Sequence, residues 1–277
     1  MRGEQALRAV LGAALRQVLA NACELIDGGQ PEHLHQCRVG LRRLRCSLRD
    51  FASLAGEPVP AAFADWSDAL AALFRRLGDA RDRDALRASL WPALRAAGAP
   101  AFDPFAATAD AQDVGVLLRA SDCNRLWLDM LAWLQPPQTP SATQPRPKAA
   151  HSLTHQVRAR LRKLHGQLAA DAARFAALDE TAQHRVRKRL KRLRYGLEAF
   201  GPLFPERELR RRQARLAAAQ DALGRYNDLL VGRRLFEAQL EAHPQAWFAL
   251  GWIASQREEA VAACTAALVR LADLRRP

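Results

Sequence analysis

The chain carries the same basic segment twice, and this repeat constrains its fold more than any other feature. One copy, HQCRVGLRRLRCSLRDF, occupies residues 35–51, and the other, HRVRKRLKRLRYGLEAF, occupies residues 184–200. A shift of 149 residues, from 35 to 184, aligns the histidine, most of the arginines and leucines, and the final phenylalanine. Such an internal repeat indicates that one structural unit occurs twice. We therefore predict two helical bundles related by pseudo-twofold symmetry.

Two further similarities support the repeat. The segment HQVRARLRKLHGQL (155–168) is a looser third copy near the start of the second half. The segments LGDARDRDAL (77–86) and LGRYNDLLVG (223–232) follow the two main copies and place Asp82 and Asp228 at matching positions. We interpret these aspartates as residues at helix N-termini, where a carboxylate caps the helix or complements its dipole.

The rest of the sequence is also helical in character. Alanine, leucine and arginine are frequent, all three favour helix, and no alternating β-branched run suggests a strand. The predicted fold class is therefore all-α. Stretches with Pro and Gly separate the expected helices, which span residues 4–26, 32–55, 60–77, 79–97, 112–134, 149–170, 180–201, 206–223, 225–242 and 245–274.

One segment is typical of a linker. Residues 136–150 are rich in Pro, Ser and Thr, a composition that disfavours regular structure. We predict a single domain over residues 1–277, with an N-terminal helical half at 1–135 and a C-terminal helical half at 151–277.

Each copy of the basic segment is expected to place charged and apolar side chains on adjoining faces of a helix. With about 100° between successive residues, the basic side chains of each copy fall in a stripe roughly 80° wide. The first basic row consists of His35, Arg38, Arg42, Arg45 and Arg49, the second of His184, Arg187, Lys191 and Arg194, and the third, from the looser copy, of His151, His155, Arg158, Arg162 and His165.

These rows carry positive charge without nearby acids. No Asp or Glu occurs within residues 33–49, 148–170 or 181–197. Like charges three or four residues apart, such as Arg38 and Arg42, cost about 0.2–0.5 kcal/mol per pair. The formal net charge is +13, from 42 basic and 29 acidic residues. We therefore expect an anionic partner, for which nucleic acid, a membrane surface and polyphosphate are the candidates.

The residue types in the rows favour one of these partners. Arginine presents a planar fork of donors that matches phosphate oxygens, and repeated rows suit an extended chain of phosphates better than one small anion. Tyr195 is the one aromatic residue close to the second row, whereas single-strand binders stack bases on aromatic side chains. Polyphosphate is the favoured partner, and a protein that binds the nucleic-acid backbone is the alternative.

Other classes of protein are disfavoured. The sequence has no nucleotide-binding glycine loop, no convincing acid–base pair and no acidic metal cluster, so we predict neither an enzyme nor a bound cofactor. Five scattered cysteines without a CxxC pair indicate neither a zinc ribbon nor a disulfide framework. His151 and His155 have the spacing of a metal pair but lack the glutamate of an H-E-x-x-H motif.

The sequence also suggests a location for the protein. Arginines interrupt the apolar N-terminus, so it does not have the pattern of a signal peptide. No apolar run approaches the roughly 20 residues of a membrane span. We therefore expect a cytoplasmic protein.

The paired His-x-x-Arg…Arg-Leu-Arg segments, with LGDARDRD and LGRYNDL, resemble the CHAD family over nearly the whole chain. The resemblance implies two helical bundles around a basic central channel that binds inorganic polyphosphate. For some members it also implies association with polyphosphate granules. Gly40, Cys37 and Glu198 depart from the family pattern. Carried over residue by residue, the resemblance implies polyphosphate binding by His35, Arg38, Arg42, Arg43, Arg45, Arg158, Arg162, Lys163, His184, Arg187, Lys191, Arg192 and Arg194.

Overall fold

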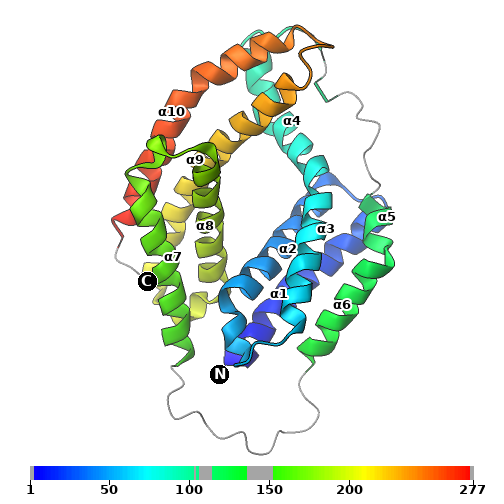
Figure 1. Cartoon of the computed structure of the whole chain (residues 1–277), viewed down its shortest axis with the longest axis vertical. Helices are drawn as coiled ribbons and strands as arrows, with labels where there is room; N and C mark the ends of the chain where they lie inside the picture. The colour runs from blue at the N-terminus through cyan, green and yellow to red at the C-terminus, as the bar shows by residue number, and fades with distance from the viewer. Residues whose placement is uncertain (1–2, 103, 106–113, 136–151, 275–277) are drawn as a thin grey trace, which may run out of the picture. The chain divides into compact units, whose positions relative to one another are not determined.

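The structure is a computed structural model, and it describes most of the chain. The described residues are 3–102, 104–105, 114–135 and 152–274, with the backbone alone for 79–85. Within these ranges the chain forms α-helices joined by turns and short 3₁₀ helices, and no strand occurs (Figure 1). The all-α prediction is confirmed.

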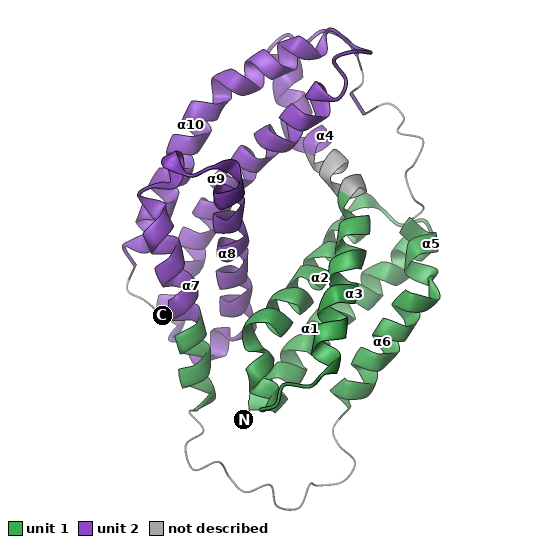
Figure 2. Cartoon of the chain, in the orientation of Figure 1, with its two compact units in different colours: residues 1–78, 112–160 green, residues 79–111, 161–277 purple. Residues whose placement is uncertain are grey.

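The chain divides into two compact units, and each unit is discontinuous in sequence (Figure 2). Unit 1 comprises residues 1–78 and 112–160, whereas unit 2 comprises residues 79–111 and 161–277. We describe each unit by itself.

Unit 1 is built on the pairing of two helices that follow one another in sequence. Helix α1 (Gly3–Ile26) packs along α2 (Pro31–Phe51), which carries the first basic row. Gly40 lies at this contact, where a Cβ atom would approach Val18 Cγ2 to 2.7 Å. The remaining elements of unit 1 are η1 (Ala52–Ala55), α3 (Ala62–Arg76), α5 (Val114–Arg119), α6 (Ser121–Leu134) and the first turns of α7 (Leu153–Ala172).

Unit 2 is built on a second pair of sequential helices. Its elements are α4 (Gly78–Ala96), the rest of α7, η2 (Phe175–Ala177), α8 (Glu180–Ala199), η3 (Gly201–Leu203), α9 (Glu206–Glu237) and α10 (Ala246–Ala272). Helices α9 and α10 pack along each other, and α8, which carries the second basic row, packs on α9. Asp179 caps α8, because its carboxylate accepts a hydrogen bond from the backbone N–H of Ala182 at 2.6 Å.

The compact units differ from the halves that the repeat suggests. Helix α4 precedes residue 135, yet its Leu86, Leu90 and Leu94 complete the core of α9 and α10 in unit 2. The first turns of α7 belong to unit 1, where Arg160 Nε donates a hydrogen bond to Asp50 of α2 at 3.1 Å. The predicted linker, 136–150, lies outside the described residues. The pseudo-twofold symmetry remains a prediction.

Most helix boundaries lie within a few residues of those predicted, but two predictions are wrong: two expected helices are one, and one expected helix is two. Helix α9 continues through Gly224, where we predicted a break, because Leu223 and Tyr226 beside it are buried. Their packing outweighs the cost of about 1 kcal/mol for a glycine inside a helix. Residues 112–134 were predicted as one helix, but Ala120, with ψ of 143°, separates α5 from α6.

The continuity of α9 also changes the interpretation of Asp228. This residue lies inside the helix rather than at its N-terminus, and its carboxylate accepts a hydrogen bond from the Ser89 hydroxyl of α4 at 3.0 Å. The aspartate therefore joins two helices of unit 2 instead of capping one. The side chain of Asp82, its counterpart in the repeat, lies outside the described residues.

Helix α1 is, among the described helices, the one with the length and composition of a membrane span. Within unit 1 it packs on α2, and its Leu7, Leu11, Leu15 and Val18 are at most 1% exposed. These side chains form part of the core of unit 1, so one face of α1 is buried within the unit.

Candidate anion-binding site

The first basic row gathers around one aromatic ring in unit 1. The guanidinium carbons of Arg38, Arg42 and Arg45 lie 4.4, 5.2 and 5.1 Å from the centroid of the Phe74 ring of α3. Arg38 is 6% exposed and donates a hydrogen bond from Nη1 to the Phe74 carbonyl oxygen at 3.2 Å. Cations over an aromatic face are stabilised by about 0.5–1 kcal/mol each at exposed sites. Phe74 therefore holds three positive charges close together.

This arrangement places Arg45 under electrostatic stress. Burial lowers the pKa of Arg45, and the charges of Arg42, Arg49 and Arg75 lower it further, while Cys46 opposes the change. Because arginine stays protonated in proteins, the lowered pKa means that the charged side chain is less stable here than in water. An anion bound beside these residues would relieve this repulsion.

The second basic row places several positive charges near His184 in unit 2. The pKa of His184 is lowered by partial burial and by the charges of Lys188, Arg187, Lys191 and, from α9, Arg234. Burial is the larger cause, and the neighbouring cations act in the same direction. At neutral pH His184 is therefore mostly uncharged and able to gain a proton when a negative charge arrives.

Like Arg38, the predicted binding residues Arg43 and Arg194 form hydrogen bonds inside their own units. Arg43 donates from Nη1 to Oε1 of Gln17 on α1 at 2.8 Å and lies outside the stripe of the first basic row. Arg194 pairs with Glu198 one turn further along α8 and donates to Gln220 of α9 at 2.6 Å. Arg192 occupies the position in α8 that Arg43 has in α2, roughly 80° from its histidine. These three residues lie less favourably for a ligand than the centres of the rows.

The predicted binding residues of the looser third copy are divided between the two units. Arg158 lies in unit 1, whereas Arg162 and Lys163 lie in unit 2, and both of these are exposed. His165 is 2% exposed, and its Nε2 lies 3.2 Å from the carbonyl oxygen of Leu271 on α10, which indicates a structural role. His151 lies outside the described residues. We find no group of three or more potential metal ligands in the described part of the chain.

Comparison with known proteins identifies the family. The model of the CHAD domain family matches residues 9–237. The chain belongs to the CHAD family. The crystal structure of the CHAD domain from the plant Ricinus communis is 32% identical in sequence and superposes with a TM-score of 0.77, over 99% of this chain and 93% of that chain. A search of curated proteins gave no match.

Membership confirms the resemblance seen in the sequence. CHAD domains form a family of non-catalytic binding domains, and the all-α structure described above matches the CHAD fold. The departures from the CHAD pattern also have local explanations. Gly40 and Cys37 face the core of unit 1, where burial raises the pKa of the Cys37 thiol to about 12, and Glu198 pairs with Arg194.

Sequence reasoning missed two groups of residues at the basic rows of this CHAD domain: an aromatic residue at the first row and three arginines near the second. Phe74 belongs to α3, and a helical periodicity describes one helix at a time, so it does not show which residue a neighbouring helix contributes. Arg233, Arg234 and Arg257 were missed as well, because acids interleave with the bases around them in sequence. These arginines surround Glu180, the first residue of α8.

Proposed function

We propose that this CHAD domain binds inorganic polyphosphate through the first and second basic rows and does not alter it chemically. The observation that carries the proposal is the convergence of Arg38, Arg42 and Arg45 on the ring of Phe74. A ligand with several negative charges would neutralise these guanidiniums together. It would also offset the burial and the repulsion from Arg42, Arg49 and Arg75, which together lower the pKa of Arg45.

The spacing of the rows favours a polymer over a single anion. From His35 to Arg49 the first row extends over about 20 Å of helix, at 1.5 Å per residue. One phosphate spans a small part of this length, whereas a chain of phosphates contacts successive turns. The second row has the same residue spacing along α8 in unit 2, from His184 to Arg194.

The proposal assigns different weights to the predicted residues. We expect the largest contributions from His35, Arg42, Arg45, Arg187, Lys191 and, in its protonated form, His184, with further contributions from Arg158, Arg162 and Lys163 of α7. Arg43, Arg192 and Arg194 should contribute less, for the reasons given above, and so should Arg38, which is 6% exposed and donates to the Phe74 carbonyl oxygen. A basic central channel and an association with polyphosphate granules remain predictions of family membership.

Titration calorimetry with long-chain polyphosphate tests the proposal. We expect the double variant Arg42→Gln/Arg45→Gln to lose about tenfold or more in affinity, because each charge-assisted hydrogen bond contributes about 1.5–3 kcal/mol. The matched control is Arg211→Gln/Arg215→Gln, which removes the same charge from exposed positions of α9. Equal losses in both variants would show that binding depends on net charge and not on the first basic row.

Competition separates the proposal from its alternative. RNA at the same concentration of phosphate groups should displace little polyphosphate at moderate salt, because bases find few aromatic platforms beside the rows. Efficient displacement would favour the nucleic-acid alternative. With added Mg²⁺ the protein should release no orthophosphate from polyphosphate, and release would identify an enzyme.

A further inference from the structure

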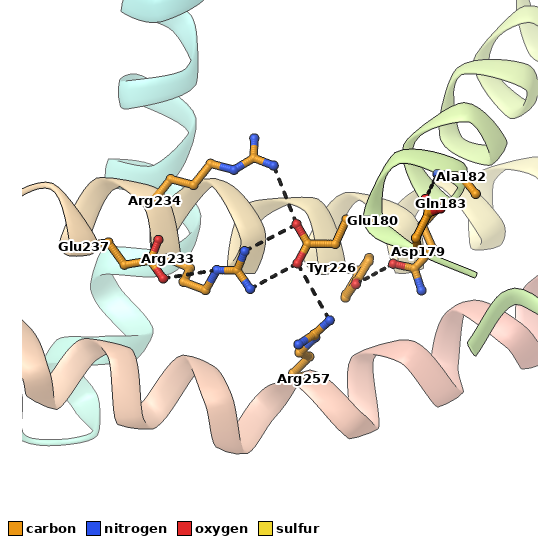
Figure 3. Close-up of polar contacts among 9 residues, drawn as sticks. All are labelled: Asp179, Glu180, Ala182, Gln183, Tyr226, Arg233, Arg234, Glu237 and Arg257. Atoms are coloured by element: carbon orange, nitrogen blue, oxygen red, sulfur yellow. Dashed lines mark hydrogen bonds and ion pairs between the residues drawn. The ribbon is translucent and has the colours of Figure 1, made fainter. Parts of the chain in front are cut away.

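One carboxylate at the start of α8 contacts three arginines from two other helices of unit 2 (Figure 3). Glu180 Oε1 lies 3.0 Å from Arg233 Nη1 and 3.7 Å from Arg257 Nη2, and Oε2 lies 3.6 Å from Arg234 Nη2. Arg233 also donates from Nη2 to Oε2 at 3.3 Å. Arg233 and Arg234 come from α9, and Arg257 comes from α10. Both carboxylate oxygens therefore lie in a cradle of guanidiniums.

Among the described side chains, the cradle has more positive than negative charge. Glu237, which lies 3.5 Å from Arg233 Nε, supplies the second described carboxylate, so three arginines face two acids. The arginine side chains are 31%, 66% and 50% exposed in the order Arg233, Arg234, Arg257, and that of Glu180 is 29% exposed. Ion pairs at such partly exposed positions are weak, typically below about 1 kcal/mol each. A solvent-borne anion with more charge can therefore compete with the Glu180 carboxylate.

The cradle continues the second basic row. Glu180 precedes His184 by four residues, so both lie on the same face of α8, about 40° apart. Arg234 is close enough to His184 to act on its charge, as it acts on Glu180. A polymer lying on the second basic row thus reaches the cradle at the N-terminal end of α8.

We propose that Arg233, Arg234 and Arg257 form a site for the terminal phosphate group of a polyphosphate chain, and that the Glu180 carboxylate occupies this site until the phosphate replaces it. This inference rests on the proposed function, because it places the end of the polyphosphate chain at the N-terminal end of the second basic row. A terminal phosphate has more negative charge than an internal one and three oxygens for the arginine forks. The N-terminus of α8 adds the favourable end of a helix dipole.

The start of α8 does not depend on Glu180. Asp179 caps the helix, and Gln183 ties its first turn to Tyr226, whose hydroxyl donates to Gln183 Oε1 at 2.6 Å (Figure 3). Glu180→Gln keeps the size of the side chain and removes its charge. We therefore expect a folded variant, which far-UV circular dichroism and thermal unfolding can verify.

The test measures the affinity for tripolyphosphate, a short chain in which two of the three groups are terminal. We expect Glu180→Gln to bind it about five- to tenfold more tightly than the wild type, because the competing carboxylate is gone. The matched control is Glu206→Gln, which changes the net charge equally but lies about 40 Å away along α9, well beyond the screening length at physiological salt.

Two further variants identify the arginines. In the Glu180→Gln background, Arg257→Gln should remove the gain, whereas Arg270→Gln, about 20 Å further along α10, should preserve it. Arg234→Gln in the otherwise wild-type chain should weaken tripolyphosphate binding and is informative even if Glu180→Gln fails to fold.

The outcomes separate this inference from the function on which it rests. Equal affinities for Glu180→Gln and Glu206→Gln, or a gain that survives Arg257→Gln, would overturn the terminal-phosphate site. Binding of long polyphosphate to the wild type would still support the basic rows in that case. If the Glu180–arginine pairs only stabilise the fold, Glu180→Gln would lower the melting temperature without raising the affinity for tripolyphosphate. That result would also overturn the terminal-phosphate site.

Discussion

His184 is the residue of the second basic row whose charge changes most readily near neutral pH. Its pKa in the folded protein lies below the value of about 6.5 in an unfolded chain. The unfolded chain therefore binds more protons as the pH falls through this range, and His184 lowers the stability of the free protein there. Above about pH 7.5 both states hold a neutral imidazole, so the contribution disappears.

Polyphosphate should reverse this effect, because negative charge favours the imidazolium form of His184. We predict that binding takes up protons near pH 6 and becomes tighter as the pH falls from 7.5 to 6. Calorimetry in two buffers with different ionisation enthalpies measures this uptake. In His184→Gln the uptake should decrease, while the affinity at pH 8 changes by less than about threefold. An unchanged uptake would show that His184 does not face the ligand.

Phe74 contributes geometry and no charge to the first basic row. Phe74→Leu retains an apolar side chain but removes the face on which the three guanidiniums rest. We predict that the affinity for polyphosphate falls about three- to tenfold, because the arginines are less ordered before binding. The dependence of affinity on salt should stay the same, since every cation is still present. A smaller salt dependence would mean that the variant displaces an arginine from the ligand.

At the level of helices, the sequence predicted which residues form each basic row. It did not predict which residues of a neighbouring helix contact that row. Periodicity placed His35, Arg38, Arg42 and Arg45 on one face of α2, and three of these surround Phe74. The same reasoning did not find Phe74, because the contact joins two helices. It also predicted a break at Gly224, since a local signal for a turn does not include the packing of α9 on α10.

Glycines in these helices have two different roles, and substitution by alanine distinguishes them. At Gly40 a Cβ atom would lie 3.1 Å from both the Ala14 carbonyl oxygen and the Val18 nitrogen of α1. At Gly224 a Cβ atom would meet nothing within 4 Å. We predict that Gly40→Ala lowers the free energy of unfolding by about 1–3 kcal/mol through overpacking. Gly224→Ala should raise it by about 0.5–1 kcal/mol, because alanine favours helix.

Urea denaturation followed by circular dichroism measures both changes. The matched control is Gly166→Ala in α7, where a Cβ atom also meets nothing within 4 Å. It should stabilise the protein as Gly224→Ala does. A destabilising effect at Gly224 would contradict a continuous α9, whereas a neutral Gly40→Ala would show that α1 and α2 separate easily.

For the whole molecule, the repeat in the sequence corresponds to one basic row in each compact unit. The boundaries of the units were not predictable from that repeat, because α4 packs according to its leucines and not according to its place in the chain. The net charge of +13 explains a general attraction for polyanions, but the rows determine where the charge is concentrated. The salt dependence of binding therefore tests whether both rows bind polyphosphate.

The last prediction concerns the number of charges that each row contributes. By analogy with single-stranded nucleic acids, each neutralised phosphate changes the slope of log affinity against log salt by about 0.7. Arg42→Gln/Arg45→Gln in unit 1 should therefore reduce the slope for long polyphosphate by about 1.4. Arg187→Gln/Lys191→Gln in unit 2 should give a similar reduction, and the fourfold variant should add the two effects, since the sites do not share residues. Binding measured at four salt concentrations tests all three variants against Arg211→Gln/Arg215→Gln. If one pair leaves the slope unchanged while the other accounts for the whole reduction, polyphosphate binds through a single row.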